Sequence, residues 1–133
     1  MVRPLSILVV DDQVSTRTLI AEALAEDRDA LVMIANDGDH ALRMVLAHRF
    51  DAIVCDVKME PVDGLSFLRA LRSHKEASIR KVPVIIMTTT ATREVVMAAH
   101  QWDATAIMAK PVSIAMLKAR LKTIRDEIGR AHV

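Results

Sequence analysis

Five short apolar segments, each followed by a stretch with helical periodicity, constrain the fold of this 133-residue chain more than any other feature. Each segment is too short for a buried helix and is bounded by polar or turn-forming residues, so each predicts a strand covered on both faces. The five are Leu5–Val10, Ala30–Ile34, Ala52–Cys55, Pro83–Thr88 and Ala104–Met108. Their strict alternation with helices predicts an α/β fold with a parallel sheet.

Five helices are expected between and after these strands. They are predicted over Val14–Glu26, from the Asn36–Asp39 turn to His48, from Gly64 onwards, over Thr92–Gln101 and over Ser113–Ile128. Apolar side chains recur at helical spacing along them, with Leu19, Ile20, Leu42, Leu46 and Leu121 among those expected to face inward. The polar segment Ser73–Lys81 predicts a surface connection. Right-handed crossovers then give a doubly wound, flavodoxin-like sheet of order 2-1-3-4-5, with its crevice between strands one and three.

Length and composition limit the classes of protein that fit. Hydrophobic residues make up 52% and charged residues 26%, which is typical of one globular domain, expected over 1–133 with a core at about 5–128 and no output domain. The net charge of +1 argues against binding to nucleic acid or to a membrane surface. The first apolar segment is too short for a signal peptide or a membrane span, and the lone Cys55 excludes an internal disulfide. A cytoplasmic location is expected, with Cys55 as a small core residue.

Polar residues of a particular kind stand where four of the strands end. Asp11 and Asp12 follow the first strand, Asp56 the third, Thr88 ends the fourth, and Lys110 follows the fifth. The carboxyl ends of parallel strands meet at one edge of the sheet, so these groups are expected to converge there. Three carboxylates close together require a cation, and hard oxygen ligands favour Mg²⁺. A metal, a carboxylate nucleophile, a hydroxyl and a lysine predict phosphoryl transfer through an acyl phosphate.

The chain resembles the receiver domain of two-component response regulators, the CheY-like family, from Leu5 to about Ile128. The resemblance rests on VVDD at Val9–Asp12, on Asp56 with Met59 and Asp63-Gly64 downstream, on Thr88 after PVIIM, and on Lys110-Pro111. Each motif is common alone, but their order and their places at the strand ends make the set specific.

The resemblance implies a role for each matching residue. Asp56 is implied to be the phosphoacceptor, and Thr88 and Lys110 to hold the phosphoryl oxygens. Mg²⁺ is implied to be bound by Asp12, Asp56 and the backbone carbonyl of Lys58, with Asp11 acting largely through a metal-bound water. A cis peptide bond between Lys110 and Pro111 is also expected.

Three positions depart from the family pattern. Ile107 stands where many receivers carry an aromatic residue that turns inward on activation, so the aromatic form of the switch is absent. Glu60 stands where a proline is usual, and Pro61 follows it. Thr89 is larger than the Ala or Gly that receivers favour after the threonine, which leads to the hypothesis that the phosphorylated form hydrolyses slowly.

The expected function is that of a single-domain response regulator that accepts a phosphoryl group on Asp56 from a histidine kinase and then changes its binding to a partner. The sequence looks most like the chemotaxis type, which binds a flagellar motor switch or serves as a phosphate sink. A phosphorelay intermediate or a developmental regulator fits almost as well. The chain is expected to be a monomer, and to catalyse only its own phosphorylation and dephosphorylation.

Three other classes remain as alternatives. A small aspartyl-phosphate phosphatase uses similar groups, but its nucleophile follows the first strand in a DxD pattern, whereas Asp11-Asp12-Gln13 stands here. A flavin-binding module shares the strand order, but Asp11 and Asp12 would repel a phosphate at that loop. A scaffold that acts without phosphorylation is the third alternative, and the complete acidic site argues against it.

Overall fold

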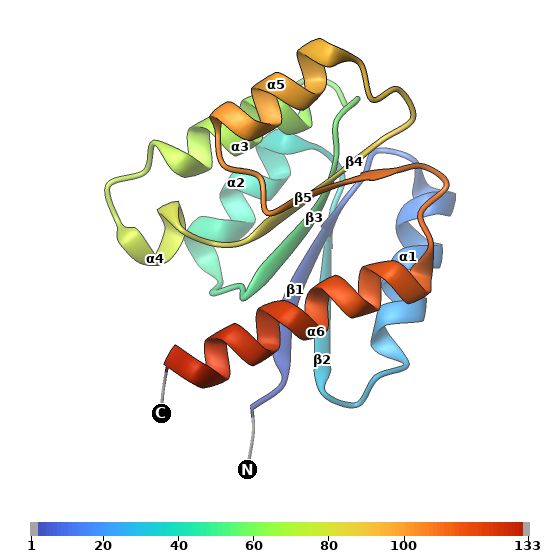
Figure 1. Cartoon of the computed structure of the whole chain (residues 1–133), viewed down its shortest axis with the longest axis vertical. Helices are drawn as coiled ribbons and strands as arrows, with labels where there is room; N and C mark the ends of the chain where they lie inside the picture. The colour runs from blue at the N-terminus through green and yellow to red at the C-terminus, as the bar shows by residue number, and fades with distance from the viewer. Residues whose placement is uncertain (1–2, 132–133) are drawn as a thin grey trace.

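A single parallel sheet with helices on both faces forms the molecule in the computed structural model, which describes residues 3–131 (Figure 1). The elements in chain order are β1 (Leu5–Val10), α1 (Val14–Ala25), β2 (Ala30–Ala35), α2 (Gly38–Ala47), β3 (Ala52–Asp56), α3 (Gly64–Arg72), α4 (Ala77–Arg80), β4 (Val84–Thr88), α5 (Arg93–Gln101), β5 (Ala106–Ala109) and α6 (Ile114–Ala131). None of these helices is both long enough and apolar enough to cross a membrane.

The strand order is β2-β1-β3-β4-β5 and every neighbouring pair is parallel, which confirms the predicted fold class. Strand residues alternate between the two faces, as a period of two requires. In β3, Ile53 and Cys55 pack into one apolar cluster, and Ala52 and Val54 into the other. All five residues of β3 and of β4 are buried, because helices cover both faces of the sheet.

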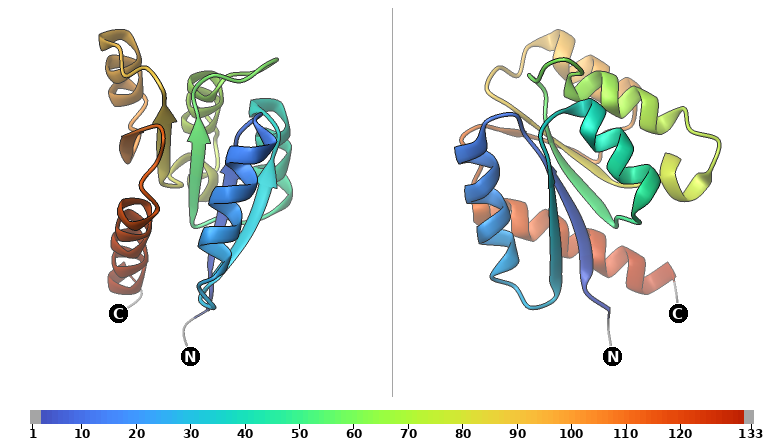
Figure 2. Two further views of the ribbon diagram at one scale, coloured as in Figure 1. Left: turned by 90° about the vertical axis from the view of Figure 1, so that its right-hand side faces the viewer. Right: turned by 180° about the vertical axis from the view of Figure 1, so that it is seen from behind.

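The two clusters define the layers seen in Figure 2. On one face, the buried helix side chains come from α2 and α3, with Phe67, Leu68 and Leu71 fully enclosed. On the other face, α1 contributes Ile20 and Leu24, and α6 contributes its stripe of Leu117, Leu121 and Ile124. The termini described by the structure lie toward the end of the sheet opposite the strand carboxyl ends (Figure 1).

Residues 3–131 form six helices, so the prediction of five was wrong by one short helix. The segment Ser73–Lys81 contains α4, a single turn over Ala77–Arg80. Its backbone bonds are local, from Arg80 N to Glu76 O and from Lys81 N to Ala77 O, and none of its residues is buried. A turn this short has no apolar stripe, so hydrophobic periodicity could not reveal it.

Two apolar helix residues expected in the core are exposed. Leu19 of α1 is 65% exposed and Leu46 of α2 is 64% exposed, so these predictions were wrong. The inward stripe of α1 is Arg17, Ile20 and Leu24, and Leu19 lies one residue, or about 100°, away from it. The fifth strand also differs from its prediction: it runs over Ala106–Ala109, because Ala104 N donates to Ala99 O and completes the end of α5.

An ion pair ties the start of β1 to the start of β3. Both terminal nitrogens of Arg3 donate to the carboxylate of Asp51, at 2.8 and 2.7 Å, and Ser6 N donates to the same carboxylate at 2.8 Å. Burial alone would raise the pKa of Asp51, but the hydrogen bonds from Arg3 and Ser6 outweigh it and hold the pKa below its ordinary value. The carboxylate therefore stabilises the fold in its ionised form.

Truncation of a buried leucine should separate the core from the surface of the helices. Leu68→Ala removes a fully buried side chain and should lower the free energy of unfolding by about 2–5 kcal/mol. Leu46→Ala changes an exposed side chain and should shift it by less than about 0.5 kcal/mol. Urea unfolding of both variants measures the difference, and equal losses would contradict the outward orientation of Leu46.

Replacement of Asp51 should give a pH-dependent loss of stability. The folded-state pKa of Asp51 is lowered, so its contribution is present above the ordinary carboxylate pKa of about 4 and is lost as the pH falls through the folded-state value. Asp51→Asn should therefore be less stable than wild type at pH 7, and the gap should close on acidification. Thermal unfolding across pH measures this, with the exposed Asp39→Asn as a control expected to change little.

Candidate functional site

The register of the sheet brings the predicted site residues to one edge. Val10 pairs with Cys55, so the residues that follow them, Asp11 and Asp56, lie side by side. Thr88 pairs with Ala109, so Lys110 leaves the sheet directly beyond the end of β4. Four polar groups that lie far apart in the sequence thus converge because each stands at the same height on parallel strands.

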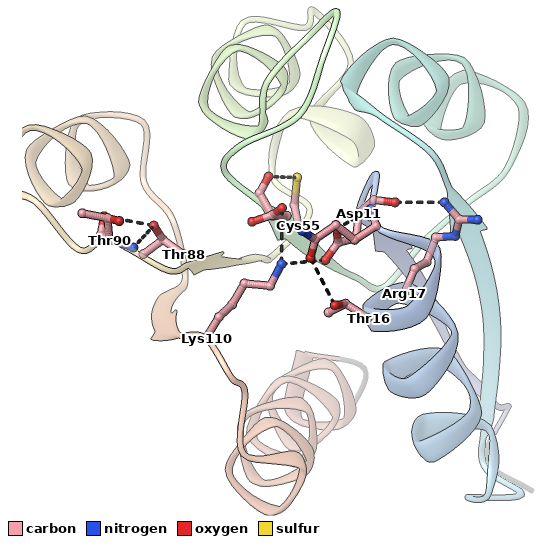
Figure 3. A network of polar contacts seen from close by, with 9 residues as sticks. Asp11, Thr16, Arg17, Cys55, Thr88, Thr90 and Lys110 are labelled. Carbon is pink, nitrogen blue, oxygen red and sulfur yellow. Dashed lines mark hydrogen bonds and ion pairs between the residues drawn. The ribbon is translucent and has the colours of Figure 1, made fainter.

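Lys110 connects the two buried carboxylates of this edge (Figure 3). Its Nζ lies 2.9 Å from Asp11 Oδ2 and 3.3 Å from Asp56 Oδ2. Asp11 is fully buried and Asp56 is 6% exposed, so these charges interact with little screening by solvent. The second oxygen of Asp11 accepts a hydrogen bond of 2.9 Å from Gln13 N, which fixes the orientation of the carboxylate.

Burial and charge shift the pKa values in this cluster. Burial, and then the neighbouring charge of Asp11, raise the pKa of Asp56 above its ordinary value, although Lys110 opposes the shift. Burial would lower the pKa of Lys110, but its hydrogen bond to Asp11 and the charges of both carboxylates outweigh this and raise it, so the lysine stays protonated. Burial likewise raises the pKa of the Cys55 thiol, and its complete burial confirms Cys55 as a core residue.

Asp12 completes a group of three carboxylates with Asp11 and Asp56. One oxygen from each can be chosen so that all lie within 4.8 Å of one another. Asp12 is exposed and also lines an open hollow of about 450 Å³ with Lys58, Met59 and Asp63. Three anionic oxygens beside a solvent-filled space suit a small hard cation that keeps part of its water shell, which is how Mg²⁺ binds. The donor set therefore fits the predicted magnesium ion.

Thr88 lies at the same edge, but its hydroxyl contacts its own loop rather than the carboxylates. Its Oγ1 donates to Thr90 O at 3.0 Å and accepts from Thr90 N at 3.1 Å. Figure 3 shows this pair set apart from the cluster around Lys110. The structure therefore brings Asp11, Asp12, Asp56 and Lys110 together, and leaves Thr88 buried nearby in a separate contact.

Glycine is required where α3 begins, beside the phosphoacceptor candidate. A Cβ atom added at Gly64 would lie 2.1 Å from the carbonyl oxygen of Asp56, far inside van der Waals contact. Gly64 N also donates to Val57 O at 2.9 Å, and the side chain of Asp63 caps α3 by accepting from Ser66 N. The Asp63-Gly64 pair therefore allows the loop after β3 to fold back against Asp56. Two peptide bonds here are cis: Glu60–Pro61, and Lys110–Pro111 as expected.

Arg17 is a residue near the site that the sequence reasoning did not identify. It is 9% exposed, and its Nη1 donates to the backbone oxygen of Asp11 at 3.0 Å. A signal was present in the sequence: Arg17 stands three residues before Ile20 and seven before Leu24, on the inward stripe of α1. A charged residue on such a stripe indicates a specific buried partner.

A family model and curated relatives both match this chain and point to the same family. A family model described as "Response regulator receiver domain" matches residues 7–122. The "Probable chemotaxis protein CheY" of Rhizobium etli is 30% identical over 120 residues, which cover 90% of this chain and 92% of that protein. The "Sensory/regulatory protein RpfC" of Xanthomonas campestris is 31% identical over 94% of this chain, which spans only 17% of that relative.

Solved structures agree with the sequence matches. The chemotaxis protein CheY4 of Vibrio cholerae superposes with a TM-score of 0.82 at 28% identity, over 91% of this chain and 98% of the other. The receiver domain of the Francisella response regulator 1452 gives a TM-score of 0.83 at 27% identity, over 92% and 98%. The fold is therefore that of CheY-like proteins, and the chain belongs to the response regulator receiver domain family. Members of this family are signalling modules rather than classical enzymes.

A methyl group at position 64 should disturb the site through the backbone. Gly64→Ala forces the Cβ against the Asp56 carbonyl and should lower the free energy of unfolding by at least about 2 kcal/mol. Gly129→Ala is the matched control, because a Cβ there meets nothing within 4 Å inside α6. It should stabilise the chain by about 0.5–1 kcal/mol. Chemical unfolding measures both, and a neutral Gly64→Ala would refute the close approach.

Proposed function

We propose that this chain is a response regulator whose Asp56 accepts a phosphoryl group from a histidine kinase. The observation that carries the proposal is the contact of Lys110 Nζ with both Asp11 and Asp56 in a group of three carboxylates. The Oδ atom of Asp56 attacks phosphorus, and the bond from phosphorus to the donor's nitrogen breaks as the new bond forms. The product is an acyl phosphate on the side chain at the end of β3.

Asp11, Asp12, Asp56 and the backbone carbonyl of Lys58 would hold a Mg²⁺ ion at this edge, with Asp11 acting largely through a water molecule. The ion supplies positive charge that offsets the charge of the phosphoryl oxygens. Asp12 and Lys58 line the open hollow, so a phosphodonor would approach the cluster from that side. Asp56 must be ionised to attack, and Lys110 supports that form by opposing the rise in its pKa.

Lys110 and Thr88 hold the phosphoryl oxygens after transfer. Lys110 is already protonated and lies 3.3 Å from Asp56, so it needs only to exchange a carboxylate oxygen for a phosphoryl oxygen. Thr88 must release both of its bonds to Thr90 before its hydroxyl can donate to the phosphoryl group. The movement of Thr88 therefore reports the phosphorylated state to the loop that precedes α5.

The phosphoryl group biases a two-state equilibrium that a partner protein reads. It adds about −1.5 to −2 charge, and a ligand can shift populations only through such a difference between states. Chemotaxis is the favoured pathway, because the Rhizobium etli relative named as a chemotaxis protein matches over 92% of its own length. In that role the chain acts as a cytoplasmic monomer and its target is a flagellar motor switch, or it serves as a phosphate sink.

Phosphorylation of Asp56 is tested by intact mass after incubation with acetyl phosphate. The wild type should gain one phosphoryl group in the presence of Mg²⁺ and none with a chelator, because the oxygens' charge is then not offset. Asp56→Asn should gain nothing, since its amide is not a nucleophile. Asp39→Asn, which replaces an exposed carboxylate on α2, is the matched control and should react as wild type does.

A phosphoryl group that persists in Asp56→Asn would contradict the assignment of the acceptor. If acetyl phosphate reacts with neither protein, transfer from a phosphorylated histidine kinase decides whether the chain accepts phosphate at all. The fate of the phosphoryl group then separates the two pathways. Binding to a motor switch protein only after phosphorylation supports chemotaxis, whereas onward transfer to a histidine phosphotransfer protein supports a phosphorelay.

A further inference from the structure

Arg17 carries a buried charge that the proposed phosphoryl transfer does not use. Its side chain extends from α1 on the side of Asp11 away from Lys110, and its Nη1 donates to the backbone oxygen of Asp11 at 3.0 Å (Figure 3). Within residues 3–131, no carboxylate lies within 4.0 Å of its nitrogens, and Nε is buried with no hydrogen-bond partner. Burial of a guanidinium without an ion-pair partner costs free energy, so a specific role for this contact is worth testing.

The peptide between Asp11 and Asp12 is the group that Arg17 holds. Asp11 is fixed in several other ways: its amide donates to Ala35 O at 3.2 Å, and its carboxylate contacts Gln13 N and Lys110. Asp12 has no such support, because its side chain is exposed and forms no hydrogen bond with the part of the chain that the structure describes. The orientation of its carboxylate depends on the peptide that precedes it.

We propose that Arg17 is a positioning residue for the metal site, which orients the Asp12 carboxylate through the Asp11–Asp12 peptide. The inference rests on the proposed magnesium site. Groups that orient metal ligands typically change metal affinity by about 10–100-fold when they are removed. Whether replacement of Arg17 weakens or strengthens Mg²⁺ binding separates a positioning role from a purely electrostatic one. A cation that acted by charge alone would repel Mg²⁺, so its removal would strengthen binding, whereas loss of a positioning group weakens binding.

The experiment is calorimetric titration of Mg²⁺ into the wild type, Arg17→Met, Arg17→Gln and Arg17→Lys, without any phosphodonor. Arg17→Met should weaken Mg²⁺ binding about tenfold or more. Arg17→Gln should do the same and takes its place if the methionine variant does not fold. Arg17→Lys keeps a cationic donor and should restore part of the affinity. Ile20→Val, on the same inward stripe of α1, is the control for lost packing and should keep the wild-type affinity despite a loss of about 0.5–1.5 kcal/mol in stability.

A second readout is the nitrogen chemical shift of the Asp12 amide, which belongs to the peptide that Arg17 contacts. It should move in Arg17→Met and Arg17→Gln before any metal is added, and stay in place in Ile20→Val. Unchanged or tighter Mg²⁺ binding in both Arg17→Met and Arg17→Gln would overturn the positioning role of Arg17 while leaving the proposed function intact. A wild type that binds no Mg²⁺ would overturn both.

Discussion

Mutual repulsion of carboxylates is the constraint on which the site depends. Two like charges about 4 Å apart cost roughly 4 kcal/mol at an effective dielectric constant near 20. The parallel sheet nevertheless brings the oxygens of Asp11, Asp12 and Asp56 within 4.8 Å of one another. Lys110 offsets part of this repulsion by contacting the two buried carboxylates, while burial and then the charge of Asp11 hold the pKa of Asp56 above its ordinary value. The site therefore retains a free-energy gain for any cation that enters it.

The rest of the fold holds this unfavourable arrangement in place. Lys110 reaches Asp11 across 99 positions of sequence, and the two meet only because β1, β3, β4 and β5 pair side by side in register. The strands are held by two apolar layers whose central side chains are completely buried, such as Leu8, Ile53 and Ile86. Burial at about 25 cal/mol per Å² of apolar surface supplies the stability that the acidic edge removes. The charged groups at the strand ends therefore depend on the apolar groups within the strands for their position.

Sequence reasoning succeeded where a residue's position follows from its place along one strand. Alternation of strands and helices predicted the parallel sheet, right-handed crossovers and the flavodoxin-like topology predicted its strand order, and strand-end polarity predicted that Asp11, Asp56 and Lys110 converge. It failed where a role depends on contacts between distant segments. The guanidinium of Arg72 donates to four backbone oxygens, of Arg80, Val82, Trp102 and Asp103, and so joins the ends of α3, α4 and α5. Nothing in the local pattern around Arg72 distinguishes it from Arg69 one turn earlier, which is exposed and lies over the Trp102 ring.

The orientation of Thr88 is the point at which structure adds most to the functional argument. Sequence placed its hydroxyl among the groups that hold the phosphoryl oxygens, yet the structure shows it bonded twice to Thr90. Thr92, two residues after Thr90, caps α5: its hydroxyl oxygen accepts a hydrogen bond from Val95 N at 3.3 Å. Under the proposed function, rotation of Thr88 toward Asp56 breaks both bonds to Thr90 and frees the loop that leads into this cap. On the same proposal, this loop links the site to the start of α5, and a change in its conformation is what a partner can recognise, with Ile107 on β5 in place of an aromatic residue.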